Sequence, residues 1–440
     1  MFFPAIPAQV EAPPAQAPLQ LDLKGALDRA RTENPMIRAA RARVDERQGL
    51  ITTTRADALP QVTLGGNFTR SQDPSILIGG FKDIATILGS LVPGGQSFNP
   101  GSMVMPRNVY SSQATLEQPL FHWGKIGTAI EIAEMGAVEA KAAYGTAELD
   151  VLHGVAKAYL GVLSAQAELE VVAVRRKTAE RFVADVKARL EAQTATELDR
   201  LRAESEFLSV LPETLQAEAA HKRALEQLNG ALGMDPRTPV QVGDLGTPTL
   251  PDSVPAGQER TEIQQYRQQE AMLKANDKII TSDLRPKLDF SGTYGTLAGR
   301  GDEMFKSLHN QWRVSVNLKF PVFDGMRSSG KRAQNRAQLE QVRQMRLDKE
   351  RAIAVERSSA ERELEKAKAL KDAATQAHAT SVEALRVSRE SFDQGLITSL
   401  DLLQAERMER QMESQRRRAE LGLWAALFDL RRSAGLPPLG

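Results

Sequence analysis

The chain contains two copies of one sequence pattern. When the sequence is shifted by 202 residues, Pro119 aligns with Pro321 and the first copy lies on the second without a gap. The densest run of matches begins at Thr196, which aligns with Thr398. Internal repetition over this length predicts two copies of one structural unit, and the two must pack in related ways.

Upstream of Pro119 the alignment changes once. Leu59-Pro60-Gln61 aligns with Arg285-Pro286-Lys287, at a shift of 226 residues, so the first copy carries 24 residues that the second lacks. These extra residues belong to a Gly-, Pro- and Ser-rich loop at about residues 71–109. The two copies are therefore expected to differ mainly in one long loop.

Each copy is predicted to contain, in this order, a helix, a strand, a loop, a second strand, a very long helix, a turn and a final helix. The predicted domains are an N-terminal Pro/Ala-rich segment (1–20), a first repeat (21–234), a Pro-rich linker (235–260) and a second repeat (261–440). The predicted elements of the first repeat are strands at about 61–70 and 109–118 and helices at 125–191 and 196–232. Those of the second are strands at about 287–295 and 311–320 and helices at 327–393 and 398–434.

The four predicted strands alternate apolar and polar residues. Val62, Leu64 and Phe68 are separated by polar residues, and Trp312 begins a similar run in the second copy. Strict alternation over this length predicts a strand with one apolar and one polar face. The strand length is close to the roughly 9–11 residues that a tilted strand needs to cross a bilayer.

The two longest helices are too long for a compact domain. At about 1.5 Å per residue, each spans on the order of 100 Å. The first helix of the chain is expected at about 23–58, with a break at Asn34-Pro35, because proline cannot donate a backbone hydrogen bond. Pro212 is expected to bend a return helix.

Composition excludes several function classes. The balance of 57 basic and 56 acidic residues gives no reason to expect nucleic acid. With no cysteine and five scattered histidines, neither a metal site nor a cofactor is expected. No run of 18 apolar residues predicts a membrane-spanning helix, and residues 1–18 lack the pattern of a signal peptide. No catalytic motif is present, so an enzyme is the least favoured class.

Four amphipathic strands cannot stand alone in lipid. An open sheet leaves two edges whose backbone groups the bilayer cannot satisfy, and a closed barrel needs about eight strands. Several chains are therefore expected to share one barrel, and three chains would supply twelve strands around a polar lumen. A barrel continued by long helices is a conduit rather than a catalyst.

Several short motifs carry a resemblance to a known family. They lie at residues 23–35, 59–61, 116–121 (LEQPLF), 318–325 (LKFPVFDG) and 394–403 (QGLITSLDLL). In this order, and duplicated, they resemble the TolC-type outer-membrane efflux channels. The resemblance implies a homotrimer in which a 12-stranded outer-membrane β-barrel is continued by a periplasmic α-helical barrel. It also implies outer-membrane lipid, a periplasmic adaptor and an inner-membrane transporter as partners, and export of drugs, metals or proteins.

The resemblance also points to a gate at the periplasmic end. Asp401 matches an acidic ring of the family, and Asp199 is its counterpart in the first copy. Gln404 replaces a second acid, and Phe392 and Ile397 stand where the best-known member has the Tyr and Arg of a latch. Helix capping explains both acids equally simply, because each follows a Thr by three residues. Capping is favoured for Asp199, whereas the two roles are balanced and compatible for Asp401.

The turns between the long helices and their return helices are the expected adaptor-docking ends. They comprise Gln193, Thr194 and Thr196 in the first copy and Gln394, Gly395, Leu396, Thr398 and Ser399 in the second. An ordinary helix connection is the simpler alternative. The basic run 416–418 is flanked by Glu413 and Glu420 and is expected to be a solvated helix face. A soluble coiled-coil scaffold or a periplasmic adaptor protein would explain the helices but not the four strands.

Overall fold

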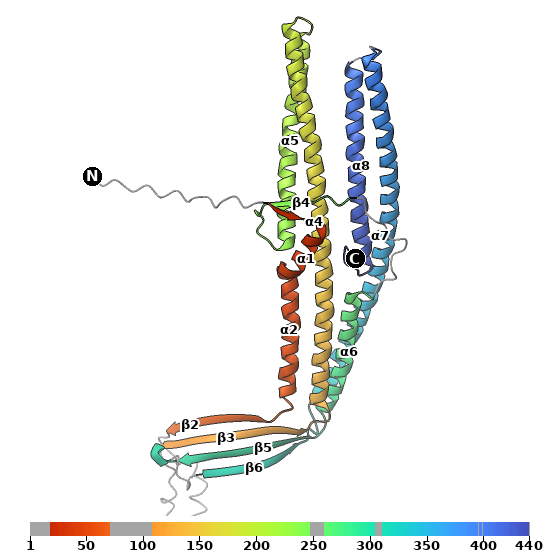
Figure 1. The fold of residues 1–440 in the computed structure, drawn as a ribbon. Coiled ribbons are helices and arrows are strands. Elements are labelled where there is room, and N and C mark those ends of the chain that lie inside the picture. The colour runs from red at the N-terminus through yellow and green to blue at the C-terminus, as the bar shows by residue number, and fades with distance from the viewer. Residues whose placement is uncertain are drawn as a thin grey trace, which may run out of the picture. The chain divides into compact units, whose positions relative to one another are not determined.

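The computed structural model describes residues 18–70, 108–246, 259–303, 310–394, 396–397 and 399–439. Its chain divides into two compact units (Figure 1). The helical unit consists of residues 1–45, 138–268 and 343–440, and the sheet unit of residues 46–137 and 269–342. Each unit thus takes chain from both repeats. Most of the predicted N-terminal segment, the long loop and part of the linker lie outside the described residues.

The long helices α4 (Lys125–Glu191) and α7 (Arg327–Asp393) run over the residues that the sequence predicts. The return helices are α5 (Glu197–Leu232), which continues through Pro212, and α8 (Ser399–Ser433). The first predicted helix is two helices, α1 (Leu23–Glu33) and α2 (Pro35–Ala56), and α6 (Thr261–Ser282) is the counterpart of α2. Asn34 separates α1 from α2: its side-chain oxygen accepts from the Met36 N–H at 2.8 Å.

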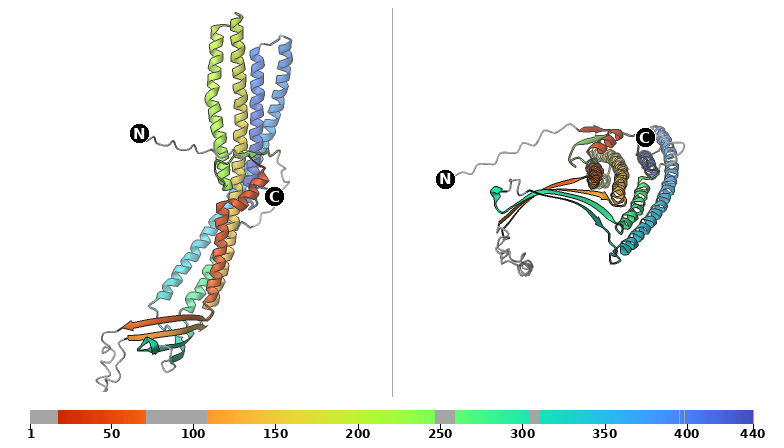
Figure 2. Two further views of the ribbon diagram at one scale, coloured as in Figure 1. Left: turned by 60° about the vertical axis from the view of Figure 1, so that its left-hand side comes forward. Right: turned by 90° about the horizontal axis from the view of Figure 1, so that it is seen from below.

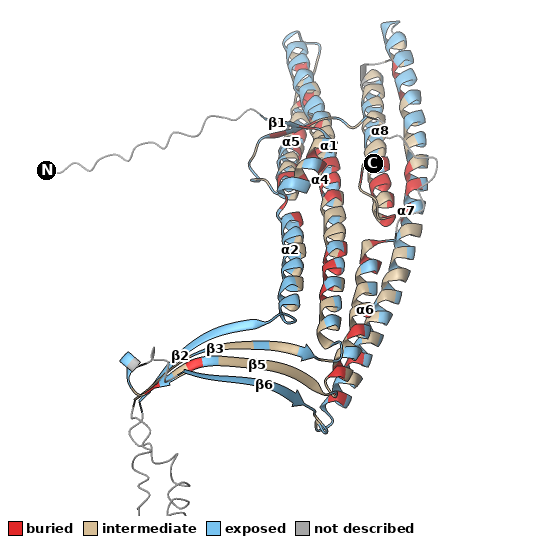
Figure 3. Cartoon of the chain, turned by 60° about the horizontal axis from the view of Figure 1, so that its bottom comes forward, coloured by how far each residue is buried: buried red, intermediate tan, exposed pale blue. Residues whose placement is uncertain are grey.

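The sheet unit holds one antiparallel sheet in the order β2, β3, β5, β6. The strands are β2 (Gln61–Arg70), β3 (Asn108–Phe121), β5 (Lys287–Ala298) and β6 (Asn310–Lys319), and a short 3₁₀ turn, η3 (Gly301–Glu303), follows β5. Figure 2 shows the four strands curved and twisted together. The edge strands β2 and β6 are almost wholly exposed and the central strands intermediate (Figure 3).

Strand β3 runs three residues past its predicted end at residue 118. Its register against β5 shifts between Pro119 and Phe121, so that Pro119 faces Asp289 and Phe121 faces Leu288. A one-residue bulge of this kind lets a strand continue past a proline, which cannot donate to the ladder.

A second, two-stranded sheet was not predicted. In the helical unit β1 (Leu19–Leu21) pairs in parallel with β4 (Val240–Val242). Beside it, the fully buried Tyr159 of α4 places its hydroxyl 2.6 Å from the Gly243 carbonyl oxygen and 3.1 Å from that of Leu21. Burial raises the pKa of Tyr159 to about 12. Tyr159 therefore ties the chain start and the segment after α5 to the core around α4.

None of the helices in the described part of the chain is sufficiently long and apolar to span a membrane. The helical unit is instead built from helices whose apolar residues face one another. Its largest cluster joins α1, α4, α5 and α8 through buried Leu, Ala and Val side chains and Phe428.

We expect Tyr159→Phe to lower the free energy of unfolding by about 1–2 kcal/mol, because the Gly243 carbonyl oxygen loses the hydroxyl that donates to it at 2.6 Å, whereas the Leu21 carbonyl oxygen still accepts from the Gly243 N–H. Tyr144→Phe on the same helix is the matched control, since no side-chain hydrogen bond of Tyr144 occurs among the described residues. Thermal unfolding of the full chain in detergent measures both variants. Equal melting temperatures for the two would contradict the role given to the Tyr159 hydroxyl.

Candidate functional site

The register of the main sheet gathers the apolar side chains on one face. Two adjacent rows, taken in the order β2, β3, β5, β6, are Val62, Leu116, Gly292, Val314 and Leu64, Ala114, Tyr294, Trp312. Successive side chains along a strand point to opposite faces. The apolar residues of both repeats therefore share one face, as the alternation predicts.

The opposite face is polar from edge to edge. Its corresponding rows are Gln61, Glu117, Ser291, Ser315 and Thr63, Thr115, Thr293, Arg313. Ser291 and Asn317 are joined by a side-chain hydrogen bond of 3.3 Å on this face. A surface of hydroxyl, amide and charged groups is suited to water.

The apolar face is open to its surroundings in the single chain. The exposed fractions of Leu64, Trp312 and Leu318 are 84%, 76% and 70%. Soluble monomers rarely leave so many large apolar side chains of one face uncovered. The face is therefore built to contact something other than water.

Aromatic residues bound the apolar face at both ends. Phe68 and Tyr110 stack at 4.7 Å at the end nearest the strand loops, and Phe121 contacts Trp123 at 5.0 Å at the end nearest the helices. The eleven steps of β3 from Tyr110 to Phe121 span about 37 Å, or roughly 28 Å along a barrel axis at a tilt near 40°. Aromatic belts at this spacing match the two interfaces of a bilayer.

The bulge in β3 places Phe121 on the apolar face. Without it, Phe121 would share the polar face with Glu117 and Pro119, because it has the same parity. The shift sets Phe121 opposite Leu288, which faces Leu318 on β6. Sequence alternation ends at the proline, so this aromatic contribution could not be found from the pattern.

The first hairpin end, between α4 and α5, is closed by backbone and capping bonds. The Thr194 N–H donates to the Arg189 carbonyl at 2.8 Å, and Gln193 adopts a left-handed φ of 57°. This is a Schellman-type ending, whose left-handed position usually holds glycine. Gln193, Thr194 and Thr196 are all exposed.

Asp199 completes a capping box at the start of α5. The Asp199 N–H donates to the Thr196 hydroxyl oxygen at 3.2 Å, and the Thr196 N–H donates to the Asp199 carboxylate at 3.0 Å. The hydrogen bond from the Thr196 side chain holds the pKa of Asp199 below its usual value. Asp199 thus has the structural role that a capping pattern predicts.

The second hairpin end, between α7 and α8, repeats the first. The Leu396 N–H donates to the Ser391 carbonyl at 2.8 Å, in the position of the Thr194 bond. Leu396 is 72% exposed and Phe392 39%, whereas Ile397 is half-buried. Gln394 is exposed; Gly395, Thr398 and the side chain of Ser399 lie outside the described part of the structure.

Asp401 lies in the first turn of α8, and its side chain is exposed, as is that of Gln404. Residues three apart on a helix share a face, so Asp401 and Gln404 present one polar strip near the hairpin end. Figure 1 shows both hairpin ends at the same end of the helical unit.

The basic run 416–418 was predicted to be a solvated helix face, but it also forms ion pairs with another helix. Arg417 pairs with Glu413 at 3.1 Å and also with Glu170 of α4 at 3.0 Å, and Arg418 pairs with Glu168 of α4. The pairs with Glu170 and Glu168 cross from the second repeat to the first. The sequence carried no signal for them, because each partner lies about 250 residues away.

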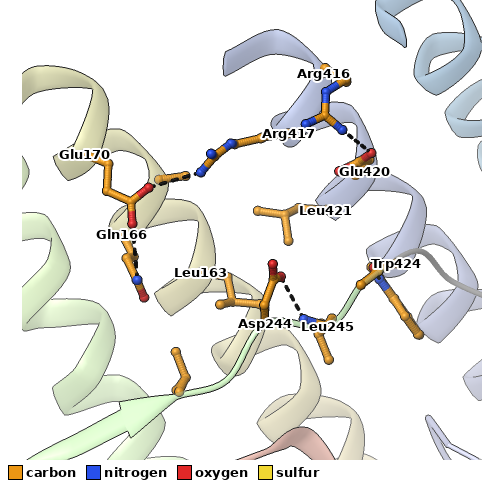
Figure 4. Close-up of a pocket in the computed structure, with 13 residues that line it drawn as sticks. Leu163, Gln166, Glu170, Asp244, Leu245, Arg416, Arg417, Glu420, Leu421 and Trp424 are labelled. Atoms are coloured by element: carbon orange, nitrogen blue, oxygen red, sulfur yellow. Dashed lines mark hydrogen bonds and ion pairs between the residues drawn. The ribbon is translucent and has the colours of Figure 1, made fainter. Parts of the chain in front are cut away.

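A cavity of about 270 Å³ lies beside this crossing. Figure 4 shows Asp244, Leu163 and Leu421 lining it, with the Arg417–Glu170 ion pair at its edge. The Trp424 indole N–H donates to the Gly246 carbonyl at 3.0 Å. No group of three or more candidate metal ligands occurs among the residues that the structure describes.

Comparison with known proteins agrees with this geometry. The model of the outer membrane efflux protein family matches residues 26–234 and 255–436. Protein CyaE of Bordetella pertussis is 26% identical over 357 residues, 78% of this chain and 69% of that protein. Outer membrane protein TolC of Vibrio cholerae is 24% identical over 313 residues, 68% of this chain and 64% of that protein.

Solved structures show the same fold. That of the outer membrane protein VceC of Vibrio cholerae superposes with a TM-score of 0.73 at 18% identity, covering 94% of this chain and 96% of the other. Fold, amphipathic sheet and helical hairpins together define an outer-membrane channel protein, whose class exports substrates as the exit channel of efflux and secretion systems. The chain belongs to the outer membrane efflux protein family. A soluble scaffold or an adaptor protein is therefore the wrong class.

Gln193→Gly should stabilise the first hairpin end. Glycine removes the strain of the left-handed conformation, which costs about 1–2 kcal/mol. About half of this gain is offset, because glycine loses more backbone entropy on folding than glutamine does. The net gain of about 0.5–1 kcal/mol should slow hydrogen exchange of the Thr194 N–H by about two- to fivefold. Gln193→Ala keeps the strain and should not slow exchange; slowing in both variants would exclude strain as the cause.

Proposed function

We propose that three copies of this chain form one exit duct, which conducts substrates passively while an inner-membrane transporter supplies the energy. The observation that carries the proposal is the sheet register, because it gathers the apolar side chains of all four strands on one face and leaves two edge strands without a partner among the described residues. Backbone groups of a sheet edge cannot remain unpaired in lipid. A second copy of the same sheet can satisfy them.

The strand directions support closure between copies. Three antiparallel pairings in succession leave β2 and β6 running in opposite directions, so β6 of one copy can pair with β2 of the next in an antiparallel ladder. Two copies would give about eight strands, an interior filled by side chains. Three copies are the smallest number that leaves a water-filled lumen, lined by the polar face.

The hairpin ends are the proposed docking surface for a periplasmic adaptor. Their exposed residues are Gln193, Thr194, Thr196, Gln394 and Leu396, and the neighbouring Gly395, Thr398 and Ser399 belong to the same turn by sequence. The 72% exposed Leu396 supports this role, because a leucine at the end of a hairpin gains free energy only when a partner covers it.

The proposed periplasmic gate is a ring of three Asp401 side chains, with Gln404, Phe392 and Ile397 close to it in the sequence. Three carboxylates near one axis would repel each other and favour cations. Gln404 adds no charge, so the ring is expected to be weaker than one with two acids per copy. Asp199, held in its capping box, is proposed to support the first hairpin rather than to gate.

Cysteine labelling tests the assignment of the two faces. In the membrane-inserted protein, Ser315→Cys should react rapidly with a small hydrophilic thiol reagent, because it would face the lumen. Val314→Cys, one residue away on the same strand, should react at least about tenfold more slowly, because it would face lipid. The chain has no native cysteine to interfere. The reverse order of rates would contradict the proposed channel.

Asp401→Asn tests the gate. The change keeps the size of the side chain and removes its charge, so we expect lower cation selectivity and weaker block by multivalent cations in planar bilayers. Asp199→Asn is the matched control, because it removes the corresponding charge of the first repeat. Unchanged currents in Asp401→Asn with a lower melting temperature would make Asp401 a structural residue only.

A further inference from the structure

The end of the main sheet nearest the helices carries two related turns. In the turn from β3 to α4, Trp123 and Gly124 both have positive φ, 52° and 75°. In the turn from β6 to α7, their counterparts Gly325 and Met326 have φ of 65° and 64°. The same left-handed pair recurs, but in the first turn its leading position holds tryptophan instead of glycine. Each turn therefore keeps one large side chain, Trp123 or Met326, in a conformation that favours glycine, and such outliers cluster at functional sites.

The Trp123 side chain is held in place from three sides. Its indole N–H donates to the Pro286 carbonyl at 2.7 Å, its ring meets the edge of Phe121 at 5.0 Å, and the Arg285 guanidinium lies 5.0 Å from the ring centre. Phe121 belongs to the apolar face through the β3 bulge. We call Phe121, Trp123 and Arg285 the stack: their side chains contact one another in this order, from the apolar face to a positive charge.

Arg285 is exposed, and among the described residues no carboxylate pairs with it. Two other carboxylates at this end of the sheet already have partners, because Asp289 lies 2.7 Å from His122 and Asp324 accepts a hydrogen bond from the Ser328 N–H at 2.8 Å. Lys125, Lys287 and Lys331 all face the single carboxylate of Asp283, at 2.7, 3.1 and 3.7 Å. Three lysines thus share one carboxylate two residues from the exposed Arg285, beside an uncovered apolar surface.

We propose that Arg285, Trp123 and Phe121 form a binding site for an anionic phospholipid of the periplasmic leaflet. The inference rests on the proposed function, in which the apolar face contacts lipid. Arg285 binds the headgroup phosphate through its forked N–H donors, while the acyl chains lie on Phe121 and the neighbouring Leu288 and Leu318.

The stack makes the arginine suited to this role. The indole face holds the guanidinium in one orientation through a cation–π contact, so less side-chain freedom is lost when phosphate binds. Indole rings also favour the level of the headgroups, and basic residues at that level attract anionic lipids. The backbone conformation of the turn fixes the position of Trp123, and through it the depth of the Arg285 guanidinium in the bilayer.

Fluorescence quenching tests the site, because the chain has only three tryptophans. Trp312→Phe with Trp424→Phe leaves Trp123 as the sole emitter in the full-length protein. Vesicles of phosphatidylcholine receive a small fraction of brominated phosphatidylglycerol or, separately, brominated phosphatidylcholine. We expect the anionic lipid to occupy the site about fivefold more strongly, the factor for one basic side chain at a membrane surface.

Arg285→Gln in the same background should remove this preference, so that the two brominated lipids quench equally. Lys319→Gln is the matched control: it removes a positive charge at the same end of the sheet, where Lys319 faces Lys287 on the polar side. It should leave the preference unchanged. If Lys319→Gln removes it as well, or Arg285→Gln keeps it, the site is wrong and only diffuse charge attracts the lipid. Loss of the preference on adding inorganic phosphate would mean an ion site instead.

A second emitter separates this inference from the function on which it rests. Trp312 lies on the apolar face and far from Arg285, so with Trp123→Phe and Trp424→Phe it should be quenched equally by both lipids. If Trp312 escapes quenching, or the native mass spectrum shows a monomer, the channel itself is contradicted. If Trp312 is quenched in a trimer and Trp123 shows no lipid preference, only the lipid site fails.

Discussion

The unpaired edges of one four-stranded sheet are the constraint on which the rest of the structure depends. A sheet with a largely apolar face is stable beside hydrocarbon, but hydrocarbon offers no partner to the backbone groups at the outer edges of β2 and β6. In the proposed assembly another copy of the sheet pairs with them. The proposed trimer and its polar lumen are consequences of that single requirement.

The helical unit is held together differently from the sheet: its helices bury their apolar side chains against one another. Buried side chains of α1, α4, α5 and α8 form its main core. Around this core, ion pairs connect segments that are far apart in the chain: Arg260 pairs with Glu356 of α7, and Arg432 of α8 pairs with Glu262 of α6. The side chains of Arg432 and Glu262 are only 12% and 10% exposed, so removing either partner would leave an uncompensated buried charge, and the pair favours the packing of α8 against α6.

Much of this architecture could be predicted from residue periodicity alone. Alternation at Val62 and Trp312 located the strands, and helix-forming composition located α4 and α7, because both signals are local. The bulge at Phe121, the pairing of β1 with β4 and the contacts of Arg417 and Arg418 with α4 were not predictable. Each depends on a partner remote in sequence, and no local pattern encodes that partner. The roles of the hairpin ends remain proposals for the same reason, since their partners are other molecules.

The pairing of β3 with β5 joins the two repeats along eleven matched positions and their bulge, and the ion pairs of Arg417 and Arg418 join them again in the helical unit. The peptide link between the repeats is therefore largely redundant once the fold has formed. Its physical contribution is a high effective concentration of one half around the other during assembly. Separate polypeptides for the two halves contain every interface needed to complement each other, and would differ from the intact chain mainly in how assembly depends on dilution.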